Sequence, residues 1–520
     1  MDAVSLSIFA NRIDAICSEM GATLQKAAFS PNIRDRLDYS CAIFDAGGEL
    51  CAQAAHIPVH LGSMAFAMSD VVSTIKWSAG DMVVLNDPYK GGTHLPDVTV
   101  IAPLFSGGEL IGFVANRAHH ADIGSETPGS MPLSSSLFEE GLIIEPSLLV
   151  KGGVLDEDYF ASLMKHMRNR QESSGDFIAQ VAANRRGLTR LAALINKMGA
   201  QAYLHSLELL NNYAATLAKD SLCEIDDGNY LFEDLLDDDG QGNTDILIRA
   251  AVKFEKGDIT LDFNGTAKQV AGNINCPLSV TAAAVYYVFR CLMPAQTPAC
   301  AGSFRSIKIL APEGSMVNAV FPAAVAAGNV ETSTRIVDVV LGALSQAIPD
   351  RIPAASHGSM NNLAMGYTAD EQAASYSPQA WDYYETIGGG MGASAFSDGQ
   401  DAVQTHMTNT LNTPVESLEM KYPLRVTRYQ VRQDSAGAGC YHGGEGLIRE
   451  YQFLAPAQVT ILSERRRHQP WGLLDGESAE VAENMLNGSP LAAKQSFKVS
   501  HGDILSISTA GGGGYGRRKA

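Results

Sequence analysis

The chain has 520 residues, of which 46% are hydrophobic and 18% charged, and its net charge is −19. This composition is typical of a globular protein, and the length allows several domains or one large fused unit. The acidic balance argues against a nucleic-acid partner, because phosphates would be repelled. Every apolar run of about 18 residues is broken by charged or polar side chains, so no membrane span is expected.

The start of the chain and its cysteines indicate the cellular compartment. The first residues contain no basic segment and no cleavable signal pattern. The eight cysteines are scattered singly, with no Cys-x-x-Cys pair, which is typical of reduced thiols. We therefore expect a cytoplasmic protein.

The predicted elements begin with a helix followed by a small sheet. Apolar residues recur at helical spacing from Ser5 to Ala28. Ser40–Phe44 and Glu49–Gln53 flank a glycine-containing turn and predict a β-hairpin. Further strands are predicted at Met82–Leu85, Val98–Leu104 and Leu110–Asn116. Residues 1–150 are thus predicted to form an α/β region, and residues 151–225 a helical segment.

The second half is predicted to be mixed and then rich in strands. Asp226–Asp239 is acidic and predicts a surface turn region, and the run Glu464–His468 predicts an exposed charged turn. The other predicted elements of residues 226–420 are a hairpin at Ile246–Val252 and Asp258–Phe263, and helices at Thr281–Leu292 and Ser333–Ile348, the second capped by Thr332, Ser333 or Thr334. Residues 421–520 predict a Gly-rich β region with strands at Leu424–Val431, Ile448–Leu454 and Val459–Leu462. The expected fold is a large, multi-lobed, mixed α+β chain.

Histidines and aspartates follow two of the predicted strands. His94 and Asp97 come after Met82–Leu85, and His119 comes after Leu110–Asn116. Two strands that end in such residues can converge on one cation. Neutral imidazole and carboxylate form a donor set that suits Zn²⁺, Mn²⁺ or Fe²⁺. The structural alternative is that these are ordinary loop and core histidines.

Several long motifs resemble those of one known family. They are Ile57–Met64, Asn86–Asp97, Asn116–Gly124, Gly328–Ser333, His406–Pro414 and Gly511–Gly516. Together they span nearly the whole chain, and they resemble the hydantoinase B/oxoprolinase family. That family includes the B subunits of ATP-dependent N-methylhydantoinase, 5-oxoprolinase and caprolactamase. It also includes the metal-bearing subunits of acetone and acetophenone carboxylases.

The resemblance implies a metal site with two histidines and two carboxylates. His94, Asp97 and His119 would supply three ligands. The fourth would be Asp38, with Asp35 as the alternative; the structural alternative for either is an ion pair with a neighbouring arginine. Such a site can keep one position open and lower the pKa of a bound water.

Other residues are candidates for supporting roles. His120 and Asp122 could orient the ligand imidazoles, since a metal-bound histidine usually donates its second N–H. Glu331, Glu385 and His406 lie in family-like motifs and could bind substrate or transfer protons. The alternative for these three is hydrogen bonding that fixes Gly-rich loops. His56 and His60 could line the same pocket or lie in the core.

The chain lacks the usual sequence signature for phosphate binding. No Gly-x-x-x-x-Gly-Lys-Ser/Thr loop is present. Gly388–Gly390 and Gly511–Gly514 are better explained by tight turns and close backbone packing. The resemblance implies that a separate hydantoinase A-type subunit, similar to the actin/hexokinase ATP-binding fold, binds ATP and phosphorylates the substrate. A hetero-oligomer such as (AB)2 is expected.

The leading functional hypothesis is the B subunit of an ATP-dependent hydrolase that opens cyclic amides such as hydantoin, 5-oxoproline or a lactam. It would carry out the metal-dependent second half-reaction. One alternative is a subunit of an ATP-dependent ketone carboxylase. Another is a structural subunit whose metal only stabilises the fold.

Overall fold

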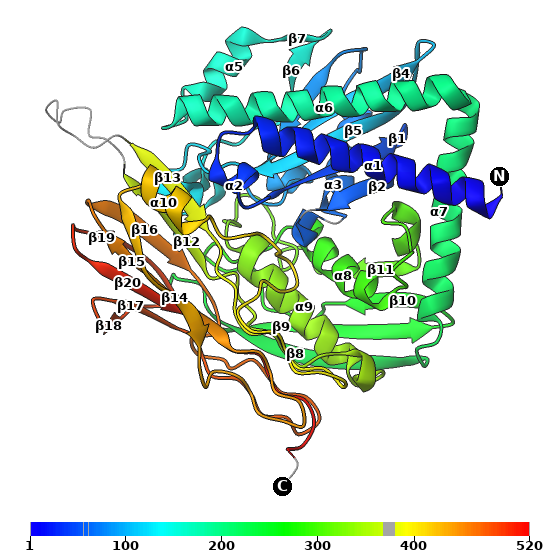
Figure 1. Ribbon diagram of the computed structural model, residues 1–520. Coiled ribbons are helices and arrows are strands. Elements are labelled where there is room, and N and C mark those ends of the chain that lie inside the picture. Colours follow the sequence, from blue (N-terminus) through cyan, green and yellow to red (C-terminus); the bar gives the residue numbers. More distant parts are fainter. Residues whose placement is uncertain (1, 56, 61, 368–379, 519–520) are drawn as a thin grey trace, which may run out of the picture.

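The computed structural model describes residues 2–55, 57–60, 62–367 and 380–518 (Figure 1). The fold is mixed α+β, as predicted. Its helices are α1 (Ala3–Ala27), α2 (Pro31–Arg34), α3 (Ser63–Thr74), α4 (Leu137–Glu140), α5 (Glu157–Met164), α6 (Arg170–Met198), α7 (Ala200–Leu222), α8 (Leu278–Leu292), α9 (Ser333–Leu344) and α10 (Val415–Lys421). Among the described residues, no helix combines the length and apolar character needed to span a membrane.

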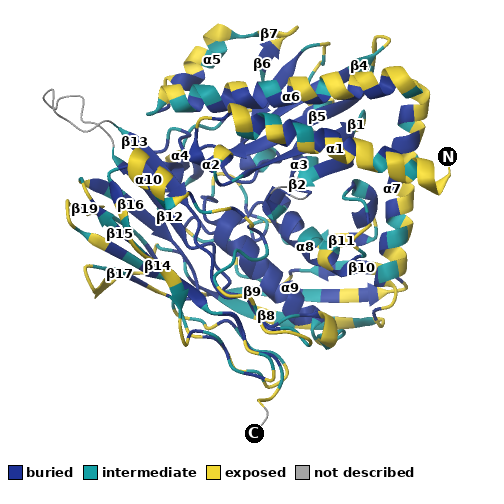
Figure 2. Cartoon of the chain, viewed as in Figure 1, coloured by how far each residue is buried: buried dark blue, intermediate teal, exposed yellow. Residues whose placement is uncertain are grey.

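The N-terminal part forms a seven-stranded sheet in the order β2-β1-β5-β4-β3-β6-β7. Its strands are β1 (Tyr39–Asp45), β2 (Leu50–Ala55), β3 (Met82–Leu85), β4 (Asp97–Ser106), β5 (Glu109–His119), β6 (Ser147–Lys151) and β7 (Val154–Leu155). Successive side chains of a strand point to opposite faces. Cys41 and Ile43 accordingly pack in the core formed with α1 and α6, whereas Ala42 and Phe44 pack against α3. The sheet is therefore covered on both faces (Figure 2).

Helix α1 follows the predicted helical pattern. Its buried side chains include Phe9, Ile13 and Met20, which lie on the face toward the sheet. The Asp2 carboxylate accepts a hydrogen bond from the backbone N–H of Ser5 and so caps the first turn. Helix α1 lies alongside α6, and α7 runs down the side of the molecule (Figure 1). The helical segment predicted between residues 151 and 225 is present as α5, α6 and α7.

A second sheet, in the order β11-β10-β9-β8, packs against α8 and α9. Its strands are β8 (Gly228–Asp238), β9 (Thr244–Glu255), β10 (Asp258–Asp262) and β11 (Ile307–Leu310). The predicted hairpin is present, but the acidic surface turn predicted at 226–239 is wrong. Most of this segment forms β8, which pairs with β9 in an antiparallel ladder. Two of its carboxylates are bound: Asp234 lies 2.9 Å from the guanidinium of Arg465, and Asp237 accepts a hydrogen bond from the backbone N–H of Arg466.

Helix α9 is buried along its whole length (Figure 2). It ends at Leu344, four residues before the predicted end at Ile348. The predicted side-chain cap is absent, because a π-helical turn, η5 (Gly328–Thr332), leads directly into the helix. The Thr332 hydroxyl instead donates to the backbone oxygen of Ile274.

The C-terminal part contains two further sheets, β13-β12-β16-β19 and β14-β15-β20-β17-β18, with a shared apolar core. Their strands are β12 (Asn362–Tyr367), β13 (Trp381–Glu385), β14 (Leu424–Arg432), β15 (Gly446–Phe453), β16 (Ala457–Leu462), β17 (Glu483–Leu486), β18 (Ser489–Pro490), β19 (Lys494–Val499) and β20 (Ile504–Ser508). The three strands predicted after residue 420 are present as β14, β15 and β16.

Below these sheets, Gly-rich segments lie side by side near the C-terminus (Figure 1). The N–H of Gly512 donates to the oxygen of Gly444, and the oxygen of Gly512 accepts from the N–H of Gly437. A Cβ on Gly512 would lie 2.0 Å from the backbone oxygen of Met391. The glycines thus permit close packing of backbones, as predicted. No turn is formed at Gly388–Gly390 or Gly511–Gly514, and none of these glycines has a positive φ.

Substitution in this glycine bundle should destabilise the protein. In Gly512→Ala the new methyl group overlaps backbone atoms that cannot move independently, so a loss of about 1–3 kcal/mol is expected. Gly47→Ala is the matched control, because its Cβ would meet only the Asp45 carboxylate at 3.4 Å. Urea unfolding midpoints should fall for Gly512→Ala and stay near wild type for Gly47→Ala. Equal midpoints for the two variants would contradict the packing argument.

Candidate metal centre

Two neighbouring strands bring a carboxylate and an imidazole together. Asp97, the first residue of β4, is directly opposite His119, the last residue of β5. His94 Nε2 lies 3.3 Å from Asp97 Oδ1, and His119 Nδ1 lies 3.5 Å from the same oxygen. All three side chains are buried, and their ligand atoms lie within 4.8 Å of one another. This is a geometry that can hold a divalent cation.

The loop between β3 and β4 places His94. Gly91 has a φ of +87° and packs so closely on α3 that a Cβ would lie 2.2 Å from the Cα of Ala67. The Asn86 side chain donates to the backbone oxygen of Leu95 and accepts from the N–H of Ile144. Only glycine fits at position 91, where the backbone packs on α3, and the Asn86 side-chain amide supplies both the donor and the acceptor of its two hydrogen bonds. The motif residues between the two strands therefore fold the loop back on the sheet.

His94 and Asp97 are poised for a cation. His94 Nδ1 lies 3.1 Å from the backbone oxygen of Ala326, which can only accept, so Nδ1 carries the proton. In the neutral ring, Nε2 then presents its lone pair to Asp97 Oδ1. Neither atom has a hydrogen-bond partner among the residues that the structure describes. Burial opposes protonation of His94, but Asp97 outweighs it and raises the His94 pKa. The pair is therefore satisfied either by a proton on Nε2 or by a metal ion that both atoms bind, and the donor set fits a metal ion.

The other carboxylate oxygen of Asp97 is held from several sides. Asp97 Oδ2 accepts from the Thr93 hydroxyl at 2.5 Å and from the Asn329 amide at 3.3 Å, and His60 Nε2 lies 3.4 Å away. Burial opposes ionisation of Asp97, but the neighbouring imidazoles of His94, His60 and His119 outweigh it and hold its pKa well below the ordinary value. Asp97 is therefore an ionised, fixed carboxylate.

Of the two candidates for a fourth ligand, Asp38 lies at the cluster. Its Oδ2 is 3.9 Å from His119 Nδ1, and its backbone oxygen accepts from the His119 N–H. Asp35 instead forms a 2.8 Å ion pair with Arg34 near the surface. The geometry therefore favours Asp38 over Asp35.

His120 and Asp122 are engaged away from the cluster. His120 Nε2 lies 3.0 Å from the Gln180 side-chain oxygen on α6, and its ring packs against Phe177. Asp122 accepts hydrogen bonds from the backbone N–H groups of Gly124 and Asn169. His120 follows His119, which is the last strand residue, so its side chain points to the other face. His120 and Asp122 therefore contact α6 and the residue that precedes it, and not the His94–Asp97–His119 cluster.

Strand β13 places a tyrosine, and not the predicted glutamate, at the cluster. The ring of Tyr384 stacks on His119, with centroids 4.5 Å apart and planes 8° apart. Its neighbour Glu385 points to the opposite face and binds Arg449 at 3.0 Å and Asn412 at 2.7 Å. Tyr384 is not among the residues predicted from the sequence. The alternation of side chains along a strand is the signal that separates it from Glu385.

Glu331 is connected to Tyr384 through one side chain. The Tyr384 hydroxyl donates to the Asn362 side-chain oxygen at 2.6 Å, and the Asn362 amide donates to Glu331 Oε1 at 2.6 Å. The Met360 N–H donates to the same Glu331 oxygen. Burial, with the nearby Glu464 carboxylate, raises the pKa of Glu331 to about 7. Glu331 therefore lies behind the cluster and does not face it directly.

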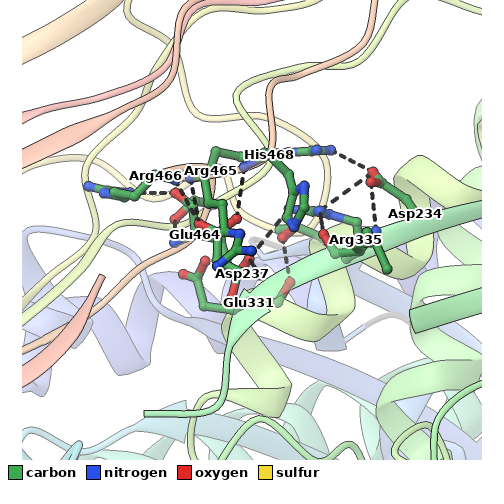
Figure 3. Close-up of polar contacts among 12 residues, drawn as sticks. Asp234, Asp237, Glu331, Arg335, Glu464, Arg465, Arg466 and His468 are labelled. Carbon is green, nitrogen blue, oxygen red and sulfur yellow. Dashed lines mark hydrogen bonds and ion pairs between the residues drawn. The ribbon is translucent and has the colours of Figure 1, made fainter. Parts of the chain in front are cut away.

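Glu331 also borders a buried network of charged groups (Figure 3). The exposed turn predicted at Glu464–His468 is wrong for Glu464 and Arg465, which are fully buried, whereas Arg467 is exposed. Glu464 pairs with Lys494, and Arg465 pairs with Asp338 at 2.6 Å. Buried charges of this kind are stable only when paired, which explains why the charged run folds inward onto the second sheet.

His406 belongs to this network and not to the metal cluster. Its Nε2 lies 3.9 Å from Asp338 Oδ1, and its Nδ1 lies 3.5 Å from the Tyr287 hydroxyl. Thr408, two residues later, lines the void beside the cluster together with His60. Of the two histidines that flank Pro58, His60 is thus at the site, and His56 lies outside the described residues.

The void beside the cluster is small. About 10 Å³ is open there to the centre of a water-sized sphere, which is close to the minimum for one water molecule. The site is an enclosed cluster of two imidazoles and up to two carboxylates on a mixed α+β scaffold. This donor set suits divalent ions such as Zn²⁺, Mn²⁺ and Fe²⁺.

The chain belongs to the hydantoinase B/oxoprolinase family, whose family model matches residues 2–518. It is 40% identical to the uncharacterised protein MJ0963 of Methanocaldococcus jannaschii over 99% of this chain and 91% of that protein. It is 39% identical to 5-oxoprolinase 1 of Arabidopsis thaliana, over 99% of this chain but only 42% of that protein. It is 31% identical to the putative B subunit of a D-/L-hydantoinase from a Pseudomonas strain, over 99% of this chain and 90% of that protein.

Solved structures show the same fold. The ATP-dependent caprolactamase of Pseudomonas jessenii superimposes with a TM-score of 0.90 at 27% identity, covering 99% of this chain and 91% of that one. An acetone carboxylase chain superimposes with a TM-score of 0.86 at 17% identity, covering 98% of this chain and 76% of that one. At that identity the second likeness concerns the fold alone.

Substituting each candidate aspartate should separate their roles. Asp38→Asn removes a charge beside His119 and should weaken binding of Zn²⁺ by at least about 100-fold, since even groups behind metal ligands contribute 10–100-fold. Asp35→Asn, its matched control, should bind Zn²⁺ as wild type does. Competition with a chromophoric chelator measures both. Loss of affinity in Asp35→Asn alone would reverse the assignment.

The raised pKa of Glu331 predicts a pH-dependent stability. The folded protein holds this proton up to about pH 7, whereas the unfolded chain releases it near the ordinary pKa of 4.5. Wild-type stability therefore falls between these pH values, and Glu331→Gln removes that fall. The difference in free energy of unfolding between Glu331→Gln and wild type should therefore shift in favour of the variant by about 2–3 kcal/mol from pH 5 to pH 8.

Urea unfolding of wild type and Glu331→Gln at both pH values provides the measurement. The exposed Glu313→Gln is the control and should follow wild type. A constant difference between Glu331→Gln and wild type across this range would show that the buried carboxyl does not titrate there.

Proposed function

We propose that this chain is the B subunit of an ATP-dependent cyclic-amide hydrolase, and that it carries out the metal-dependent second half-reaction on a substrate phosphorylated by a partner subunit. The observation that carries the proposal is the buried cluster of His94, Asp97 and His119 in a chain of the hydantoinase B/oxoprolinase family. The caprolactamase that shares the fold, and the 5-oxoprolinase among the relatives, act by name on cyclic amides.

The cluster fits a resident metal ion. His94, Asp97 and His119, with Asp38 as the fourth ligand, would hold Zn²⁺, Mn²⁺ or Fe²⁺. When bound, such an ion supplies a Lewis acid that polarises a carbonyl or phosphoryl oxygen and makes water more acidic. This chemistry suits an amide made electrophilic by phosphorylation, because an unactivated lactam resists attack by water.

The chain's own residues orient the cluster and exclude solvent. Thr93 and Asn329 hold one oxygen of Asp97, which leaves the other free toward His94. The stacked ring of Tyr384 fixes the plane of the His119 imidazole. Because the void is too small for a cyclic amide, its lining must move to admit the substrate. Activity that depends on an associated partner is consistent with such a closed site.

We propose a hydantoinase A-type subunit as that partner. The sequence has no phosphate-binding loop of the Gly-Lys-Ser/Thr type, and one relative is named as the B subunit of a hydantoinase. The chain spans 42% of the Arabidopsis 5-oxoprolinase, so the remainder of that longer protein is long enough to contain a nucleotide-binding part. We place the hetero-oligomer, such as (AB)2, in the cytoplasm, where ATP is available and free cysteines such as those observed remain reduced.

The test is reconstitution with the A-type subunit and separate measurement of ATP turnover and ring-opened product. With ATP and 5-oxoproline, hydantoin or caprolactam, the complex should open the ring of at least one of these substrates. The chain alone should neither hydrolyse ATP nor open a ring. Asp97→Asn should lower ring opening by at least about 1,000-fold, since several kcal/mol of transition-state stabilisation are lost. ATP consumption by the partner should persist.

Other outcomes would identify another function. Bicarbonate-dependent consumption of acetone or acetophenone would assign the chain to a ketone carboxylase. Unchanged ring opening by a metal-free complex would reduce the metal to a structural role. Substrate-stimulated ATP hydrolysis by the chain alone would refute the division of labour.

A further inference from the structure

Helix α4 carries a buried glutamate behind the metal cluster. Glu140 is fully buried, whereas Phe138 on the same helix is 65% exposed. Glu140 Oε1 accepts three hydrogen bonds: from the Ser134 hydroxyl at 2.8 Å, and from the backbone N–H groups of Val325 at 2.8 Å and Ala326 at 2.9 Å. One carboxylate oxygen thus fixes two consecutive amides of the segment 321–326.

That segment also touches the cluster. Ala326 donates its N–H to Glu140 and accepts from His94 Nδ1 through its own carbonyl oxygen, at 3.1 Å. Ala326 therefore lies between the glutamate and the histidine. A histidine that binds metal through one nitrogen is oriented by the hydrogen bond at its other nitrogen. The position of the Ala326 carbonyl therefore decides where His94 Nε2 points.

The rest of the segment is held to the same helix. The N–H of Leu137 donates to the oxygen of Pro322, and the rings of Phe138 and Phe321 pack edge to face with centroids 5.5 Å apart. Helix α4 and residues 321–326 thus form one unit. Within this unit, Glu140 is the side chain that binds the backbone N–H groups of Val325 and Ala326.

A carboxylate is a costly residue for this position. Burial opposes its ionisation, and Glu140 Oε2 has no hydrogen-bond partner among the residues described. A neutral amide oxygen could accept the same three hydrogen bonds. A carboxylate adds negative charge, which interacts favourably with a positive charge on the His94 imidazole or on a metal ion bound to it. That charge makes the ligand nitrogen more basic.

We infer that Glu140 is a positioning residue of the metal centre, which orients His94 through the backbone of Ala326. The inference rests on the metal centre proposed above. It assigns to Glu140 no contact with substrate.

Metal binding by purified variants tests this role. Zn²⁺ affinity is measured by competition with a chromophoric chelator, and ligand geometry by the visible absorption of the Co²⁺ form. Glu140→Ala should bind Zn²⁺ about 10–100-fold more weakly than wild type and shift the Co²⁺ bands. Glu140→Gln keeps an accepting oxygen, so it should recover most of the affinity and remain roughly threefold weaker. Glu139→Ala, an exposed neighbour on the same helix, is the control and should match wild type.

The thermal midpoint of each metal-free variant separates positioning from folding. Wild-type affinity in both Glu140 variants would overturn the inference, as would a loss that only parallels unfolding of the metal-free protein. If Glu140→Ala does not fold, Glu140→Gln decides, since an affinity and Co²⁺ spectrum identical to wild type would reject the role of the charge. A wild-type protein that binds neither ion would overturn the metal centre and this inference together.

Discussion

His94 Nε2 and Asp97 Oδ1 face each other 3.3 Å apart in the interior, a contact that is favourable only when a proton or a metal ion lies between the two atoms. Much of the surrounding structure maintains it. The Ala326 carbonyl fixes the tautomer of His94, and Thr93 and Asn329 hold the opposite oxygen of Asp97. Because these atoms are shielded from water, solvent cannot supply their interaction partner, whereas a bound metal ion can interact with both of them.

The site is assembled from distant parts of the chain. His94, Asp97 and His119 come from the first sheet, Asn329 from the turn before α9, and Tyr384 from the third sheet. Neither the N-terminal region nor the C-terminal sheets could form this environment alone. The buried charged network joins the second sheet to residues 464–468 in the C-terminal part (Figure 3). Long-range packing thus brings together the parts of the chain that surround the site.

The sequence predicted those features that depend on local patterns. Helical spacing predicted α1, and short apolar runs predicted the strands that carry Asp97 and His119. The motif around His94 indicated a metal site, and the structure brings those three residues together. Pairing across the chain was not predictable: the acidic run of β8 and the basic run at 464–468 each suggested a surface, because neither pattern shows that the two neutralise each other. Tyr384 was missed for a similar reason, since its contact with His119 depends on how two sheets meet.

The glycine bundle has a consequence for the order of folding during synthesis. Gly512, Gly513 and Gly514 supply hydrogen-bond partners to Gly444, Ala355 and Glu477, all of which are translated earlier. Those earlier segments also bond to one another, since the N–H of Gly444 donates to the oxygen of Met391 and the N–H of Ala355 donates to the oxygen of Trp471. Residues 511–516 add further partners only after these segments have been synthesised. Completion of the bundle therefore depends on contacts between residues far apart in the chain, which makes it a slow step of folding.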